Sequence, residues 1–232
     1  MGIAEQIIYE DNHLIALNKR PGQIVQGDKT GDIPLVEEVR SFLKERDGKP
    51  GNVFCGVIHR LDRPVSGVIV FAKTSKALSR MNGLVQSRDF RKTYYAVVKN
   101  RPPEEAGRLE NHIVRVERNN KSFVTSDAQR SDAKLAVLDY RLRAVSSGGY
   151  HLLEVELHTG RHHQIRCQLS HMGCPIKGDL KYGAERSNPD GSISLHAYRL
   201  RFEHPVRHEP VVIAAPVPWN YFAECDYETE QQ

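Results

Sequence analysis

The chain has 232 residues, of which 39% are hydrophobic and 27% are charged, and its formal net charge is +4. This composition is typical of a globular protein long enough to bury one sizeable core, and no apolar run reaches the length of a membrane span. The N-terminus lacks the basic start and apolar stretch of a secretory signal. Four cysteines without a C-x-x-C pair argue against a disulfide scaffold and favour a reducing cytoplasm.

The charge of the chain is unevenly placed. Residues 209–232 hold five acidic side chains and no basic one, so the remainder carries about +9. A basic body favours a polyanionic partner such as nucleic acid, because neutralising phosphates releases counterions. A solvated surface of mixed charge is the alternative interpretation.

The first half of the chain alternates strand and helix patterns. Two short strands within residues 7–26 surround the turn sequence EDNH, and apolar spacing predicts a helix within residues 33–48 that Gly48 ends. A β-branched run predicts a strand over 67–74. A helix over 75–90 follows with Ser75 as its N-cap, and then a strand over 91–100.

The second half is richer in strands. We expect short strands and turns over 103–136, and a hairpin of strands 134–145 and 150–160 joined by SSGG. A short helix over 162–173 and strands over 195–205 and 209–218 follow. The pattern predicts an α+β fold, with a largely antiparallel mixed sheet and flanking helices in a single domain. The acidic segment 223–232 is expected to fray.

The segment HRLDRPVSG, residues 59–67, places Asp62 between Arg60 and Arg63 on a loop before a strand. Pro64 and Gly67 fix this loop. Neighbouring cations favour the ionised carboxylate, which can act as a nucleophile or a base. An ion pair that only stiffens a surface loop is the alternative.

A second polar cluster lies in residues 156–183, where a strand ends and a helix begins. Arg161, His163, Gln164 and Arg166 gather at this helix start, which suits an anionic ligand. The histidines of this stretch raise the possibility of zinc, but their spacing fits no common zinc motif, so we expect no metal. Solvated polar residues on a turn are the third interpretation.

Two tyrosines, Tyr94 and Tyr95, follow each other in a predicted strand and therefore point to opposite faces. One is expected in the core. The other is free to stack on a nucleobase.

Five segments of the chain, in order, resemble sequence signatures of the RluA family of RNA pseudouridine synthases. They are NKRPGQIV, HRLDRPVSGVIVFAKT, KTYYAVV, TGRHHQIRCQLSHMGCPIKGDLKYG and LHAYRLRFEHP. The resemblance implies a catalytic domain over residues 1–222 with a basic central cleft, and no N-terminal S4 domain. It implies an isomerase that detaches a uridine of tRNA or rRNA at N1 and reattaches it through C5, without a cofactor or a metal.

The resemblance also implies roles for individual residues. Asp62 is the essential aspartate, and attack on C1′, attack on C6 and removal of a sugar proton all remain open. Tyr94 stacks on the target base, Arg166 pairs with Asp62, and Arg60 enters the gap that the flipped base leaves. The residues assigned to substrate binding are Arg60, His59, Arg161, His163, Gln164 and Leu169.

Physical chemistry agrees with these implied roles. A uridine in stacked RNA is out of reach until it is flipped, which costs a few kcal/mol. An arginine can fill the vacancy and bind phosphate, and a fixed guanidinium keeps a buried carboxylate ionised. We expect a cytoplasmic monomer that binds RNA and no membrane.

The chain departs from the family pattern at Arg20, Val65, His162 and Gln168, none of which is a proposed catalytic residue. Two other functions remain as hypotheses: a catalytically silent RNA-binding protein, and a metal-dependent hydrolase built on the histidines.

Overall fold

The computed structural model describes residues 2–28, 30–220 and 222. The predicted acidic segment 223–232 lies outside the described residues. The chain divides into two compact units. The first comprises the residues up to Thr93 together with Ala197–Pro216, and the second comprises Tyr94–His196 with the residues from Val217 onward.

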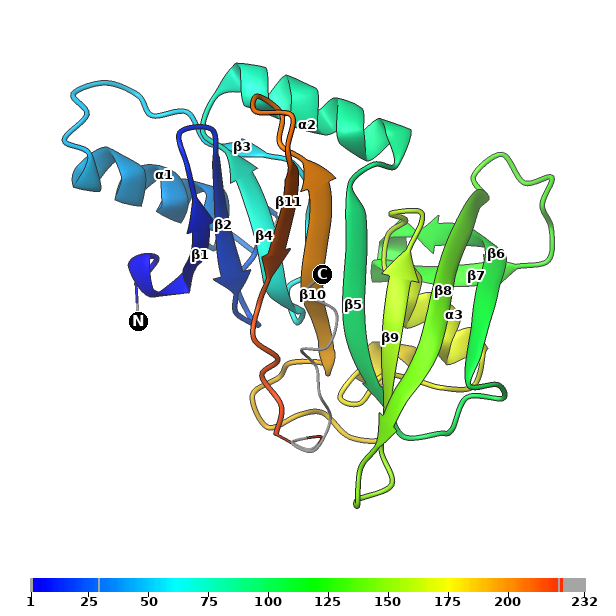
Figure 1. Cartoon of the computed structure of the whole chain (residues 1–232). Helices are drawn as coiled ribbons and strands as arrows, with labels where there is room; N and C mark the ends of the chain where they lie inside the picture. The colour runs from blue at the N-terminus through cyan, green and yellow to red at the C-terminus, as the bar shows by residue number, and fades with distance from the viewer. Residues whose placement is uncertain (1, 29, 221, 223–232) are drawn as a thin grey trace. The chain divides into compact units, whose positions relative to one another are not determined.

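The first unit combines helices and a sheet (Figure 1). Its strands are β1 (Ile7–Glu10), β2 (Leu14–Lys19), β3 (Gly56–Val57), β4 (Ser66–Ala72), β10 (Leu195–Glu203) and β11 (Pro210–Ala214). Its helices are a short 3₁₀ turn (Ala4–Gln6), α1 (Leu35–Arg46) and α2 (Ser75–Ser87). The strand order is β1-β2-β4-β10, with β11 on β10 and β3 on β4. The pairs β1–β2, β2–β4, β3–β4 and β10–β11 are antiparallel.

Strand β4 is the centre of this core, since every one of its residues is buried. Val68 and Val70 pack with Met81 of α2, while Ile69 and Phe71 alternate to the other face and are also unexposed. A strand that is buried on both faces reads as a continuous apolar run, which is why SGVIVFA was recognisable.

The turn between β1 and β2 is held by Asp11, whose carboxylate joins both ends of the first unit. Its Oδ1 accepts the backbone N–H groups of His13 and Leu14 at 2.7 and 2.8 Å. Its Oδ2 accepts the Tyr9 hydroxyl at 2.6 Å and lies 2.8 Å from Nε2 of the unexposed His204. The predicted turn is confirmed, and its aspartate ties the N-terminal hairpin to the end of β10.

The second unit contains β5 (Arg91–Val98) from Tyr94 onward, and the whole of β6 (Ala106–Val116), β7 (Lys121–Thr125), β8 (Lys134–Val145) and β9 (His151–Leu157). Their order is β5-β9-β8-β6-β7. The pairs β6–β7, β6–β8 and β8–β9 are antiparallel. Helix α3 (Gln164–His171) packs against β6 and β7, and 3₁₀ turns lie at Glu117–Asn119 and Leu180–Tyr182.

The α+β class and the predicted 134–145/150–160 hairpin are confirmed, but three details differ. Helix α2 begins one residue after Thr74, and the Thr74 hydroxyl accepts the Ala77 N–H at 3.1 Å, so Thr74 is the N-cap in place of Ser75. The helix ends at Ser87, because Arg88 adopts a left-handed conformation. Strand β6 is longer than expected, because much of it is exposed and its apolar residues do not alternate regularly with polar ones.

Candidate active site

Asp62 lies on the loop between β3 and β4, as predicted, and its residue is half-buried. The Val65 N–H donates to the Asp62 carbonyl at 3.0 Å and closes a turn through Arg63 and Pro64. Proline fixes the backbone at the centre of this turn. The carboxylate is therefore carried on a short, defined turn directly before the buried strand β4.

A buried lysine, Lys19, holds this turn through hydrogen bonds to its backbone. Lys19, at the end of β2, is unexposed, and its Nζ donates to the carbonyl oxygens of Val65 at 2.7 Å, Arg20 at 3.0 Å, Arg63 at 3.1 Å and Asp62 at 3.3 Å. One ammonium group thus ties the Asp62 turn to the end of β2. Lys19 belongs to the family-like segment NKRPGQIV, and the sequence predicted no role for it. A lysine at the end of a strand that begins with four apolar residues was the available signal.

The charge of Lys19 is linked to that of Asp62. Burial lowers the pKa of Lys19 to about 7, and the negative charge of Asp62 opposes this shift. The lysine therefore gives the turn a positive charge that titrates near neutral pH.

Two further contacts fix the same turn. The Gly22 N–H donates to the Arg63 carbonyl at 2.8 Å, and Arg63 forms an ion pair with Asp32. Behind the turn, Gly67 has a φ of +112°, and an added Cβ would lie 2.6 Å from the Ala197 backbone nitrogen. Only glycine fits there, which explains the glycine that follows Ser66.

His59 and Arg60 precede Asp62 on the same segment. Nε2 of His59 accepts the Val70 N–H at 3.1 Å, and its ring lies 5.1 Å from the Phe90 ring. Burial lowers the pKa of His59 to about 3, so the ring is neutral and carries its proton on Nδ1. The Arg60 side chain is exposed.

In the second unit, helix α3 carries the other predicted cluster. It begins at Gln164, directly after His163, whose φ of 52° is left-handed. The Gln164 Oε1 accepts the Thr159 hydroxyl at 2.8 Å and the Arg161 N–H at 3.0 Å. Its Nε2 donates to the Gln168 side chain at 3.0 Å. These bonds fasten the turn before the helix to its first two turns.

Arg166 forms a buried ion pair that sequence reasoning missed. Its Nε and Nη2 donate to the two carboxylate oxygens of Asp179 at 2.6 and 2.8 Å, and the two side chains are only 6% and 1% exposed. The Tyr182 ring lies 5.0 Å from the guanidinium carbon. A bidentate fork and an aromatic face together fix the plane of Arg166. Both partners of Arg166, Asp179 and Tyr182, lie in the segment KGDLKY, which is part of the family resemblance and was the available signal.

His163 is buried beside this pair. Its Nδ1 lies 3.0 Å from the Tyr182 hydroxyl, and its ring stacks on His162 with centroids 3.8 Å apart. Burial, with a contribution from the Arg166 charge, lowers the pKa of His163 to about 2, so the ring is neutral. The Tyr182 hydroxyl also accepts the Ser122 N–H at 2.8 Å, which links the turn to β7.

The remaining predicted residues of the second unit differ in exposure. Arg161 is exposed, and its Nε donates to the Leu135 carbonyl at 2.8 Å. Leu169 is unexposed, and Tyr94 on β5 is 6% exposed. The hydroxyl of Tyr95 donates to Glu154 at 3.4 Å. Asp62 thus belongs to the first unit and Tyr94 and Arg166 to the second, and each cluster has its own internal supports.

The described residues contain no group of three or more His, Cys, Asp or Glu side chains placed to hold a metal ion. Within the same residues, Cys55, Cys167 and Cys174 are buried free thiols. Among the described helices, none is long and apolar enough to cross a membrane.

Comparison with known proteins decides the family. The family described as RNA pseudouridylate synthase matches residues 13–171. The chain belongs to this family. Its members are isomerases that convert uridine to pseudouridine in RNA, and the predicted resemblance is confirmed.

Curated relatives and solved structures agree with this assignment. An uncharacterized RNA pseudouridine synthase of Chlorobaculum parvum is 32% identical, over 91% of this chain and 70% of that protein. The ribosomal large subunit pseudouridine synthase D of Xylella fastidiosa is 37% identical, over 91% of this chain and 66% of that protein. The tRNA pseudouridine synthase C of Vibrio vulnificus is 32% identical, over 91% of this chain and 90% of that protein.

The fold also matches a solved structure. Human RNA pseudouridylate synthase domain containing 4 superposes with a TM-score of 0.77 at 24% identity, over 94% of this chain and 91% of that one. This likeness shows the fold.

Proposed function

We propose that this protein isomerises a uridine of tRNA or rRNA to pseudouridine and that Asp62 is its essential carboxylate. The observation that carries the proposal is the Asp62 turn, which a buried lysine ties to the end of a core strand through four backbone carbonyls. A reactive group must be held to a fraction of an ångström, and a turn fixed at several points meets this requirement.

The reaction is an isomerisation, so it needs no external reactant. The bond between N1 and C1′ breaks, a bond between C5 and C1′ forms, and the C5 proton leaves while N1 gains one. The carboxylate of Asp62 can attack C1′, attack C6 or remove a sugar proton, and each route uses the ionised form. An ionised carboxylate in a water-poor site needs a fixed cation near it.

The roles of the other residues follow the family pattern. Arg166, held by Asp179 and the Tyr182 ring, is proposed as the guanidinium that keeps Asp62 ionised. Tyr94 is proposed to stack on the flipped uracil, and Leu169 is proposed to pack against it. His59, Arg161, His163 and Gln164 are proposed to bind or position the RNA, and a basic cleft is proposed to accept it.

The relatives suggest the class of RNA. Their names include a ribosomal large subunit enzyme and a tRNA enzyme, so both classes remain candidates. The buried free thiols suit a reducing compartment, and we propose a cytoplasmic monomer.

Pseudouridine mapping tests the proposal. Ribosomal and transfer RNA from parent and deletion cells are treated with carbodiimide and read by primer extension. We expect one or a few stops in the parent that are absent from the deletion strain. Purified protein added to the deletion RNA should restore them. Identical maps, with no restoration, would reject the proposed function.

A further inference from the structure

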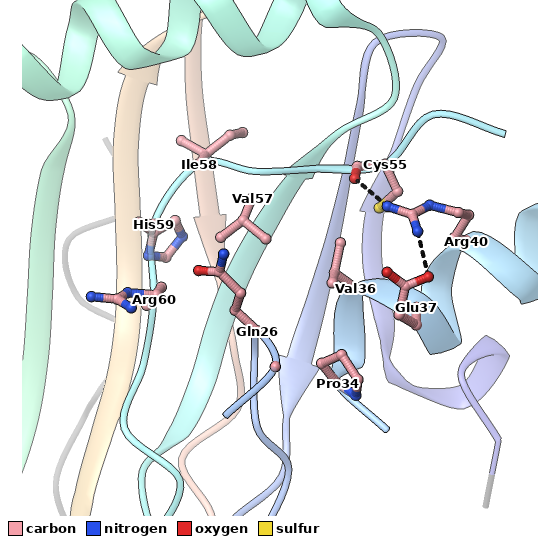
Figure 2. Close-up of a pocket in the computed structure, with 11 residues that line it drawn as sticks. Gln26, Pro34, Val36, Glu37, Arg40, Cys55, Val57, Ile58, His59 and Arg60 are labelled. Carbon is pink, nitrogen blue, oxygen red and sulfur yellow. Dashed lines mark hydrogen bonds and ion pairs between the residues drawn. The ribbon is translucent and has the colours of Figure 1, made fainter. Parts of the chain in front are cut away.

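The first unit contains a pocket of about 620 Å³ (Figure 2), and His59 is the one lining residue to which the proposed function gives a role. It lies between the loop at residues 26–27, the beginning of α1 and the segment 55–60. Its volume falls within the range of small-molecule and cofactor sites. Val36, Val57 and Ile58 give it an apolar wall.

Polar groups stand at the edge of this wall. Arg40 forms an ion pair with Glu37 and its Nη2 donates to the Cys55 carbonyl at 3.4 Å, so these charges balance each other. Figure 2 shows the side chain of Gln26 directed toward His59. An apolar wall with amide and charged groups at its edge suits a planar heteroaromatic ring.

The other end of the pocket carries positive charge and lies beside a buried donor. Across the described residues, Arg60 has no hydrogen-bond or ion-pair partner. The buried Nδ1 of His59 also has none, although a neutral ring that accepts at Nε2 carries its proton on Nδ1. The positive charge of Lys92 also acts on His59. A buried donor without a partner is unfavourable, and this cost is located at the Arg60 end of the pocket.

The position of the pocket relates it to the reaction. Arg60 is two residues from Asp62, so their Cα atoms are at most about 7 Å apart. A strand of RNA that presents a uridine to Asp62 therefore passes Arg60, and the neighbouring nucleotide is the part of the substrate within reach of the pocket.

We propose that this pocket binds the nucleotide next to the target uridine, with its base on the apolar wall and its phosphate toward Arg60. The edge of the base meets Gln26 and the Glu37–Arg40 pair, which gives the enzyme a preference for the base at that position. This proposal rests on the proposed function, because the strand is brought there by the target uridine.

The test combines two changes, one in the protein and one in the RNA. Gln26→Trp fills the pocket from an exposed loop position. Lys44→Trp is the control, because Lys44 is an exposed residue of α1 that does not line the pocket. A stem-loop around the mapped uridine is prepared intact and with one abasic nucleotide at each flanking position. kcat/KM for pseudouridine formation is measured for every combination.

We expect one flanking abasic site to lower the wild-type kcat/KM by about fivefold or more, which is the lower limit for a base contact. Gln26→Trp should lose a similar factor on intact RNA and nothing further on that abasic RNA, because both changes remove the same contact. Lys44→Trp should behave as the wild type.

Three results would overturn the pocket proposal and leave the isomerase activity standing. The losses from Gln26→Trp and from the abasic site could multiply, the abasic sites could have no effect on the wild type, or Lys44→Trp could lose as much activity as Gln26→Trp. A wild-type protein that forms no pseudouridine would overturn the proposed function, and the pocket proposal with it.

Discussion

Asp179→Asn tests the support of Arg166 in the second unit. The substitution keeps the shape of the side chain and removes its charge. One of the two acceptor oxygens, now 2.6 and 2.8 Å from the guanidinium nitrogens, becomes an amide that cannot accept. Arg166 then remains charged and almost fully buried, without the Asp179 carboxylate.

The magnitude follows from these contacts. A hydrogen bond to a charged group contributes about 1.5–3 kcal/mol, and removing one partner of a buried ion pair costs about 3–5 kcal/mol. Because the asparagine oxygen retains one bond, we expect the free energy of unfolding to fall by about 3 kcal/mol. Arg166 also loses its fixed orientation, so pseudouridine formation should slow by about 100-fold, as for an ångström-scale misplacement.

Urea unfolding measures the first effect through the fluorescence of Trp219, the single tryptophan of the chain. Asp132→Asn is the matched control, since Asp132 forms a similar fork with Arg130 at 2.9 and 2.9 Å on the exposed surface. We expect no measurable change from that control. The reasoning is refuted if Asp179→Asn unfolds like the wild type and turns over its substrate at the wild-type rate.

Three further substitutions address other supports. Lys19→Met should slow pseudouridine formation by about 100-fold at unchanged RNA affinity, because the Asp62 turn loses its common donor. The wild-type free energy of unfolding minus that of Lys19→Met should rise between pH 7 and 10.5. In this range the folded lysine, with a pKa of about 7, has released a proton that the unfolded lysine keeps. A difference that does not change with pH contradicts this. Burial opposes ionisation of Asp11, but its hydrogen bonds outweigh this and hold the pKa of that carboxyl well below its usual range. Asp11→Asn should therefore lower the free energy of unfolding by about 2 kcal/mol at pH 7, with the difference shrinking below pH 3.8, and equal pH profiles would argue against the role of Asp11. Gly67→Ala should give insoluble protein or a loss of more than about 2 kcal/mol, measured by urea unfolding, and a stable variant would contradict the close approach at that position.

The sequence predicted the elements whose signal is local. The hairpin of β8 and β9 was placed by alternating residues and the SSGG turn, and α1 by its apolar spacing before Gly48. The length of strand β6 was underestimated, because the apolar residues of this half-exposed strand do not follow a regular alternation. The cap at Thr74 was missed by one residue, since Thr and Ser are both good caps and adjacent.

The sequence predicted the reactive residue of the candidate site, but it did not predict the buried charged residues that hold the site in place. Asp62 was expected on a proline-fixed loop, and the structure has it there. Lys19 and Asp179 received no role, because a charge that is buried through contacts distant in sequence has no periodic signal. The hydrogen bonds of Gln164 and the full burial of Leu169 likewise depend on tertiary packing.

The central claim is that the carboxylate of Asp62 carries out the chemical step, and Asp62→Asn tests it most directly. Wild type and variant are compared under single-turnover conditions on RNA that contains the mapped uridine, with RNA affinity and urea unfolding measured in parallel. We predict that the variant folds and binds RNA as the wild type does but forms no pseudouridine. Pseudouridine formation by Asp62→Asn at the wild-type rate would contradict the account.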